Sequence, residues 1–350
     1  MVGVGLKFYI LTSESIQALK RHFAPDFSAI PVEQAVVIIN TLDANYEREA
    51  VEYCREQGIE HHVTVSNGTP ARGKNSVMEV FLSSDNDYCV LVDGDDFLTK
   101  HGVWMYNHLA TTDTPPDAVC LVSQFSYRRY GKGGVIACNP FTLDYDKELS
   151  IDLYKEFKNT RAIGHKKAAH FARLHKSYYK NQRKYSEGNE VHCRVTWFSR
   201  KAATFKFDES IRIGEDTLHM LRLKHEAIKN GLRFYSTDER PATYVYDECT
   251  YGIVARDSKL GTDYGWMDTY LVALGRMKKK GQLHANTLLP ELRIHYPSDL
   301  AYDDIAIDTS FVHKLPECDF GFPKNATEES VRNAYSFLLK NALLRKREAA

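Results

Sequence analysis

Strand-like and helix-like segments alternate along the first 125 residues, and this alternation limits the possible folds more than any other feature of the sequence. Strand-like runs lie at 6–12, 34–40, 61–65, 87–93 and 118–125. Segments with helical character lie between them, near 14–22, 46–57, 72–84 and 102–110. Strands that are apolar along their length and alternate with helices are typical of a largely parallel sheet covered on both faces. The sequence therefore predicts an α/β fold.

The pattern changes after this region. A glycine-rich segment, YRRYGKGGVIAC, has the character of a hairpin, and a basic tract rich in His and Tyr follows it. Order returns at 194–207, followed by a helical segment at 214–231 and a strand-like one at 232–236. We expect residues 1–255 to form the main domain and residues 256–350 to form a mainly helical C-terminal extension.

Cysteine use and hydropathy bear on the compartment. The seven cysteines are scattered and never form C-x-x-C, which argues against a disulfide framework and against a zinc ribbon. No run of about 18 apolar residues occurs, and the N-terminus lacks the features of a signal peptide. We therefore expect a cytoplasmic protein without a transmembrane segment. Lys plus Arg and Asp plus Glu balance at 46 each, so the net charge indicates no partner.

Three carboxylates follow the most apolar strand, in the sequence VLVDGDD at 90–96. Ligands of open parallel sheets bind beyond the carboxyl ends of the strands, which is where Asp93, Asp95 and Asp96 are expected. Carboxylates two residues apart in an extended segment share a face and can converge on one cation, and oxygen ligands favour Mg²⁺ or Mn²⁺. Gly94 lets the backbone turn. A solvated acidic turn without a metal is the alternative interpretation.

Residues 68–76, GTPARGKNS, match most of a phosphate-binding loop. Gly68, Gly73 and Lys74 have the G-x-x-x-x-G-K spacing, after a predicted strand and before a predicted helix. Asn75 stands where the motif has the Ser or Thr that binds Mg²⁺. A P-loop kinase or NTPase is therefore one alternative function. The other interpretation is a turn shaped by Gly68, with Lys74 in the following helix.

A second acidic pair, Glu215 and Asp216, follows Gly214 at the start of the predicted helix 214–231. Carboxylates at this position commonly cap a helix, because the helix dipole favours negative charge there. His219 lies one turn further along the same helix, and no third metal ligand is identified by the pattern.

Four segments in this order resemble the GT-A nucleotide-sugar glycosyltransferases, specifically the large family 2 group. They are ARGKN at 71–75, VLVDGDD at 90–96, GED at 214–216 and NGLRFY at 230–235, within a resemblance that covers about residues 6–250. The resemblance implies a GT-A-type, Rossmann-like catalytic domain at 1–255. It implies a metal-dependent inverting transfer of a sugar from a nucleoside-diphosphate sugar, with a UDP-sugar favoured, to a hydroxyl group.

The resemblance also implies roles for individual residues. Asp95, with Asp93, would hold Mn²⁺ or Mg²⁺, and Asp216 would be the general base with Glu215 beside it. The residues implied in donor binding are Asp93, Asp95, Asp96, Asn40, Asp43, Arg72, Lys74 and Thr12. Asn40 and Asp43 would replace the Asp-rich end of the second strand that is common in the family. Two extra residues separate Arg72 from Asn75 in comparison with the family's ARN segment.

A basic tract at 151–184 carries ten Lys or Arg residues and two acidic ones. It lies in the insertion 151–195, where the family commonly places acceptor-recognition elements. Lys and Arg neutralise phosphates while Tyr and Phe stack on bases, so we predict DNA as the acceptor, with hydroxymethylated pyrimidines of bacteriophage DNA as the target. The compartment would then be the cytoplasm of an infected bacterium. A surface glycan or another anionic polymer is the alternative acceptor, and a solvated helix face is the non-functional interpretation.

Overall fold

The structure is a computed structural model of the chain. It describes residues 5–23, 30–98, 100–121, 125–130, 133–138, 194–210, 215–237, 244–247, 289–292, 294, 295 and 297. The basic tract 151–184 and most of the predicted C-terminal extension 256–350 lie outside the described residues, so the predictions made for them remain predictions.

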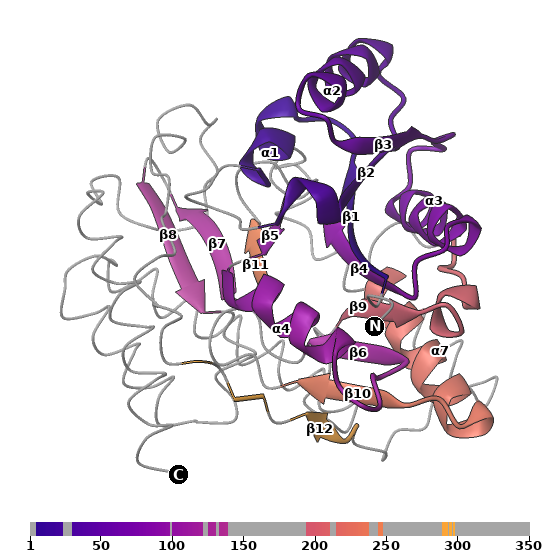
Figure 1. Cartoon of the computed structure of the whole chain (residues 1–350). Helices are drawn as coiled ribbons and strands as arrows, with labels where there is room; N and C mark the ends of the chain where they lie inside the picture. The colour runs from indigo at the N-terminus through magenta and orange to yellow at the C-terminus, as the bar shows by residue number, and fades with distance from the viewer. Residues whose placement is uncertain are drawn as a thin grey trace.

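An eight-stranded sheet forms the centre of the described fold, in the order β12-β10-β6-β9-β4-β1-β2-β3 (Figure 1). The strands are β1 (Leu6–Thr12), β2 (Ala35–Ile39), β3 (Glu60–Val63), β4 (Tyr88–Asp93), β6 (Ala118–Leu121), β9 (Arg194–Ser199), β10 (Phe234–Thr237) and β12 (Glu291–Leu292). Neighbouring strands are parallel, except that β9 runs antiparallel to both β4 and β6. The predicted α/β fold with a mostly parallel sheet is therefore confirmed.

Helices cover both faces of this sheet (Figure 1). One face packs against α1 (Ile16–Arg21), α2 (Ala44–Glu56) and α4 (Lys100–Ala110), and the other against α3 (Pro70–Ser83) and α7 (Glu215–Asn230). Along β1, Phe8 and Ile10 join the first core and Tyr9 joins the second, because successive side chains of a strand point to opposite faces. Since both faces are buried at the centre of the sheet, β1, β2 and β4 are largely apolar, whereas the edge strand β3 is polar and mostly exposed. Two short 3₁₀ helices, η1 (Val32–Gln34) and η3 (Ala202–Thr204), complete the helical elements of the described residues.

A second sheet of four strands has the order β5-β11-β7-β8. Its strands are β5 (Phe97–Leu98), β7 (Phe125–Tyr130), β8 (Gly133–Cys138) and β11 (Tyr244–Asp247). The predicted hairpin is confirmed, because β7 and β8 pair antiparallel. The single strand predicted at 118–125 is wrong in one respect: β6 ends at Leu121 in the main sheet, and Phe125 begins a strand of the second sheet.

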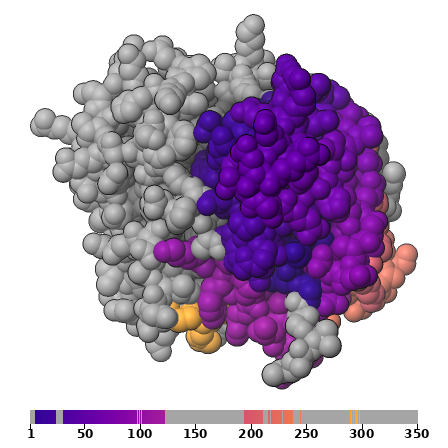
Figure 2. Space-filling model, turned by 45° about the horizontal axis from the view of Figure 1, so that its top comes forward, coloured from indigo at the N-terminus to yellow at the C-terminus, as the bar shows by residue number. Residues whose placement is uncertain are grey.

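The two sheets meet near the end of β4. β5 follows the acidic turn directly, and β11 pairs with it antiparallel. The short strand β12, which lies within the predicted C-terminal extension, adds to the edge of the main sheet beside β10. In the view of Figure 2, most of the indigo-to-magenta residues gather on one side of the molecule. No helix among the described residues is long and apolar enough to cross a membrane.

Candidate active site

The acidic turn lies at the carboxyl end of β4, a central strand of the main sheet. Asp93 is the last residue of β4, and Gly94, Asp95 and Asp96 form the turn that leads into β5. One carboxylate oxygen from each of Asp93, Asp95 and Asp96 lies within 4.8 Å of the others. The structure therefore places the three predicted carboxylates together at the sheet edge where ligands of α/β proteins bind.

A divalent cation fits this group of carboxylates. The Oδ1 atom of Asp93 is buried and has no hydrogen-bond partner among the described residues. A buried acceptor without a partner costs free energy, and a bound cation would remove that cost. Oxygen ligands alone are the set that suits Mg²⁺ or Mn²⁺. Asp93 and Asp95 are the residues that would hold the ion.

The backbone of the turn is held from three sides. The Gly94 amide donates to the Leu11 carbonyl of β1 at 2.6 Å, and the Gly94 carbonyl accepts from His22 Nε2 at 3.0 Å. Arg21 donates to the Asp95 carbonyl. A Cβ atom on Gly94 would lie 2.4 Å from the Leu11 oxygen, so the turn requires glycine because of close backbone approach. Burial, aided by Arg21, lowers the pKa of His22 to about 3, so this imidazole is neutral.

Arg194 and Tyr244 hold the carboxylates of the turn. Arg194, the first residue of β9, donates to Asp93 Oδ2 at 2.5 Å and to Asp96 Oδ2 at 2.7 Å. The Tyr244 hydroxyl donates to Asp96 Oδ2 at 3.0 Å and accepts from the Asp93 amide at 3.2 Å. Burial would raise the pKa of Asp93, but Lys74 and Arg194 lower it below its usual value, so Asp93 is ionised.

Lys74 joins the two acidic stretches. Its Nζ atom lies 2.8 Å from Glu215 Oε1, 2.5 Å from Asp216 Oδ1 and 3.7 Å from Asp93 Oδ2. The side chain is buried, and burial alone would lower its pKa. The three carboxylates outweigh burial and raise the pKa of Lys74 well above its usual value. An ammonium group thus connects the end of β4 to the start of α7, although these segments are more than 100 residues apart.

Glu215 and Asp216 differ in exposure. The Glu215 side chain is 8% exposed and the Asp216 side chain is 24% exposed. Burial raises the pKa of Glu215, against the effect of Lys74. Asp216 is therefore the more open of the two carboxylates. His219, one turn further along α7, stacks on Phe207 and donates from Nε2 to the Phe205 carbonyl at 2.9 Å, so its ring is used within the core.

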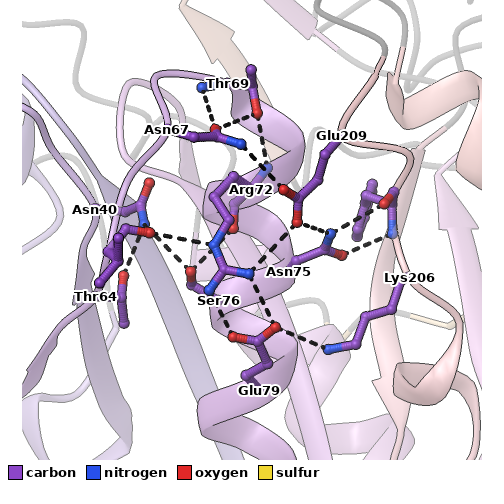
Figure 3. A network of polar contacts seen from close by, with 12 residues as sticks. Asn40, Thr64, Asn67, Thr69, Arg72, Asn75, Ser76, Glu79, Lys206 and Glu209 are labelled. Carbon is purple, nitrogen blue, oxygen red and sulfur yellow. Dashed lines mark hydrogen bonds and ion pairs between the residues drawn. The ribbon is translucent and has the colours of Figure 1, made fainter.

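Four residues predicted to bind the donor make contacts within the fold. Asn40 donates to Thr64 Oγ1, to the Val65 carbonyl and to Ser76 Oγ (Figure 3). The other contacts are those of Thr12 with the Tyr46 hydroxyl, of Asp43 with the first amides of α2, and of Arg72 with Glu79. Arg72 thus points along α3 toward Glu79 (Figure 3). Donor contacts of these residues remain predictions.

The segment 68–76 does not have the conformation of a phosphate-binding loop. Thr69 caps α3, and Pro70 occupies its first position. The Gly73 amide donates to the Thr69 carbonyl at 3.3 Å, and a Cβ atom at Gly73 would lie 2.9 Å from Leu11. Gly73 therefore serves close packing of helix on sheet, and the P-loop interpretation has no structural support. Asn75 faces the segment before α7, where its amide bonds both the N–H and the carbonyl of Phe207 (Figure 3).

Sequence reasoning did not find Arg194, Tyr244, Arg21 or His22. Each is buried, and each contacts the acidic turn from an element that is distant in sequence. No motif marks these residues, since their positions depend on which strands become neighbours. Lys74 was predicted to bind the donor, and the structure places it between the two acidic stretches.

No protein-family model and no curated protein matches the sequence. Solved structures similar to the chain include residues 1–349 of S. aureus TarS in complex with UDP-GlcNAc, with 12% identity, a TM-score of 0.44, and coverage of 81% of this chain and 68% of that chain. A mannosyltransferase from Pyrobaculum calidifontis in complex with GDP-Man and Mn²⁺ has 11% identity and a TM-score of 0.38, and 80% of this chain and 77% of that chain are covered. The match spans 37% of a longer S. aureus TarS chain.

Proposed function

We propose that this protein is a nucleotide-sugar-dependent glycosyltransferase that acts with inversion. One observation carries the proposal: Lys74 Nζ contacts both Asp93, at the acidic turn, and Asp216, at the start of α7. A group for the leaving diphosphate and a group for the incoming hydroxyl therefore lie on either side of one ammonium group. The order of motifs that resembles the family 2 glycosyltransferases supports the same function.

The side chains at this site can divide the work of a direct displacement. Asp216 would accept the proton of the acceptor hydroxyl, which then attacks the anomeric carbon as the bond to the diphosphate breaks. Lys74 would hold Asp216 in place through their 2.5 Å contact. A divalent cation held by Asp95 and Asp93 would neutralise charge on the departing diphosphate. A single displacement without a covalent intermediate inverts the configuration of the sugar.

The proposal extends to the donor and the acceptor. We expect a UDP-sugar, with Thr12, Asn40, Asp43 and Arg72 near the donor side of the site and Asp96 supporting the turn. We expect the basic tract 151–184 to bind DNA whose pyrimidines carry hydroxymethyl groups. A basic tract with interleaved aromatic residues suits a nucleic acid. A surface glycan or another anionic polymer is the alternative acceptor.

Mass gain of the acceptor tests this function. The protein is incubated with Mn²⁺ or Mg²⁺, pooled UDP-sugars, and either hydroxymethylated DNA or an anionic glycan, and the acceptor mass is read afterwards. We expect transfer to the DNA and none with EDTA. A mass gain on the glycan alone would mean that the acceptor is a glycan and not DNA. No mass gain on either acceptor, together with no thermal protection by nucleotide with any metal, would contradict the function.

Two variants connect this activity to the site. Asp216→Asn should keep metal-dependent thermal protection by UDP but lose transfer, because the amide has the shape of the carboxylate and cannot accept the proton. Asp95→Asn should lose the protection itself. Asp208→Asn is the matched control. Asp208 lies on the segment before α7 and pairs with Arg222 at 2.8 Å, so this variant should leave both readouts unchanged. Full activity of Asp216→Asn would rule out the base.

A further inference from the structure

Arg194 has a position that the proposed chemistry does not require. Its side chain is 4% exposed and lies at the start of β9, which runs antiparallel to both of its neighbours, β4 and β6. Its two terminal nitrogens bond two different carboxylates, Asp93 at 2.5 Å and Asp96 at 2.7 Å. A planar guanidinium fixes the directions of both bonds at once, so the two carboxylates cannot rotate independently.

Tyr244 reaches the same two residues from the second sheet. Its hydroxyl donates to Asp96 Oδ2 and accepts from the Asp93 amide, and Tyr244 is fully buried. The guanidinium carbon of Arg194 lies 4.0 Å from the centre of the Tyr244 ring, which supports the guanidinium from one side. Strands β9 and β11 therefore hold the turn together, although neither contains a residue of the acidic motif.

The contacts divide the carboxylate oxygens into two sets. Asp93 Oδ2 and Asp96 Oδ2 are bonded by Arg194, and Asp96 Oδ2 is also bonded by Tyr244. Asp93 Oδ1 is left buried and without a hydrogen-bond partner among the described residues. One oxygen of Asp93 thus serves the protein, while the other is directed by the same bond and remains available for a ligand.

We infer that Arg194 and Tyr244 form a clamp that orients the Asp93 carboxylate toward a divalent cation. The same clamp keeps the Asp96 carboxylate hydrogen-bonded within the protein, so that the cation is held through Asp93 and Asp95. The inference rests on the proposed function, because it assumes a cation at this turn. Arg194 and Tyr244 are positioning residues, since neither would touch the cation or the substrate. Groups that orient metal ligands commonly contribute tenfold to a hundredfold in metal affinity.

Charge-conserving variants separate positioning from simple electrostatics. Arg194→Lys keeps the positive charge, but a single ammonium group cannot direct two carboxylates as the guanidinium fork does. Tyr244→Phe changes no charge and removes only the hydroxyl. Arg200→Lys is the matched control, because Arg200 follows the other end of β9 and donates to carbonyls at the end of α3, including Ser84 at 2.6 Å.

Calorimetric titration of the full chain with Mn²⁺, alone and with saturating UDP, measures the affinity directly. We expect Arg194→Lys to raise the Kd for Mn²⁺ about tenfold or more. Tyr244→Phe should raise it by a smaller factor, and Arg200→Lys should leave it unchanged even where its unfolding temperature falls. Asp96→Asn should change the Kd much less than Asp95→Asn, because Asp96 is retained by the clamp.

Several results would overturn the clamp. One is an unchanged Mn²⁺ affinity in both Tyr244→Phe and a folded Arg194→Lys. Another is a change in the Kd for Mn²⁺ in Asp96→Asn as large as that in Asp95→Asn. The third is a wild-type chain that binds Mn²⁺ neither alone nor with UDP. If Arg194→Lys does not fold, Tyr244→Phe decides the result alone. Normal Mn²⁺ binding without sugar transfer would instead contradict the proposed function and leave the clamp in place.

Discussion

At the scale of single residues, Lys74 has the most demanding environment in the site. It is buried with Glu215 and lies within ion-pair distance of three carboxylates. Removing ions from water is costly, and here the cost is offset only because each charge has close partners. A lone lysine or a lone glutamate at this place would be strongly unfavourable. The residues of this cluster therefore depend on one another for stability as well as for chemistry.

A double-mutant cycle on Lys74 and Glu215 tests this dependence. Lys74→Met should lower the free energy of unfolding by about 3–5 kcal/mol, since it leaves buried carboxylates without their cation. The double variant Lys74→Met/Glu215→Met should recover a large part of that loss, because a well-packed apolar pair can replace a buried ion pair. Urea denaturation gives the free energy of unfolding of each single variant and of the double variant.

The surface pair Lys7–Glu60 provides the control for this cycle. Its side chains are 24% and 48% exposed and lie 3.4 Å apart, so Lys7→Met should cost at most about 1 kcal/mol. Losses that simply add in the Lys74 and Glu215 double variant would contradict the coupling.

At the scale of elements, the connection between β4 and β5 is held by several of its neighbours. β1 contributes the Leu11 carbonyl, the end of α1 contributes Arg21 and His22, and β9 and β11 contribute Arg194 and Tyr244. The acidic residues sit on this connection, so their positions are set by packing around the turn. A rigid first set of ligands is what a cation site or a diphosphate site needs.

Gly94→Ala tests the fit of this connection against β1. The new methyl group would lie 2.4 Å from the Leu11 oxygen and 3.0 Å from Thr12 Cα, and backbone atoms cannot move aside as a flexible side chain can. We expect a loss of about 2 kcal/mol or more in the free energy of unfolding, from strain and from a weakened hydrogen bond between the Gly94 amide and the Leu11 carbonyl. Equilibrium denaturation in urea measures this loss.

Gly58→Ala is a suitable comparison for Gly94→Ala. Gly58 has φ +66°, and a Cβ atom added there would meet no other part of the described fold within 4 Å. Its cost should therefore be only the backbone term of about 1 kcal/mol. Equal losses in the two variants would show that the close approach to β1 is unimportant.

At the scale of the whole molecule, neutral histidines are buried on both faces of the main sheet. His22 follows α1 on one face, and His219 belongs to α7 on the other. Burial lowers the pKa of His22 to about 3 and the pKa of His219 to about 4. An unfolded histidine takes up a proton below about pH 6.5, whereas these folded ones do not. The stability that they contribute is therefore complete above that pH and is lost as the pH falls.

The acid sensitivity of the fold should depend on His219. Between about pH 6.5 and pH 4, this residue should reduce the free energy of unfolding by about 1.4 kcal/mol for each pH unit of acidification. His219→Phe keeps an aromatic ring against Phe207 and should make the slope of stability against pH shallower by that amount. Urea denaturation at a series of pH values gives the slope, which does not depend on the absolute stability of the variant.

A His219→Phe slope equal to the wild-type slope would contradict the assignment of His219 as a buried neutral group.

Local sequence patterns were sufficient to predict the main helices and strands and the class of the fold. Period-3.6 patterns in the helices and apolar runs in the central strands are local consequences of burial, so β1, β2, β4 and the helices between them could be predicted. The position of Asp93 at a strand end and the need for Gly94 in a turn follow from the same local pattern. The antiparallel direction of β9 was not visible locally, because an apolar strand has the same pattern in either direction.

The contacts between side chains of the site could not be predicted in this way, because they depend on the three-dimensional arrangement of the elements. Lys74, Arg194 and Tyr244 reach Asp93 from α3, β9 and β11, and their contacts depend on strand order and helix packing rather than on any neighbouring residue. The same holds for Asn40 and Arg72, whose hydrogen bonds go to partners within the fold. Long-range contacts arise because burying apolar surface brings distant segments together, and the polar groups carried with them must then find partners.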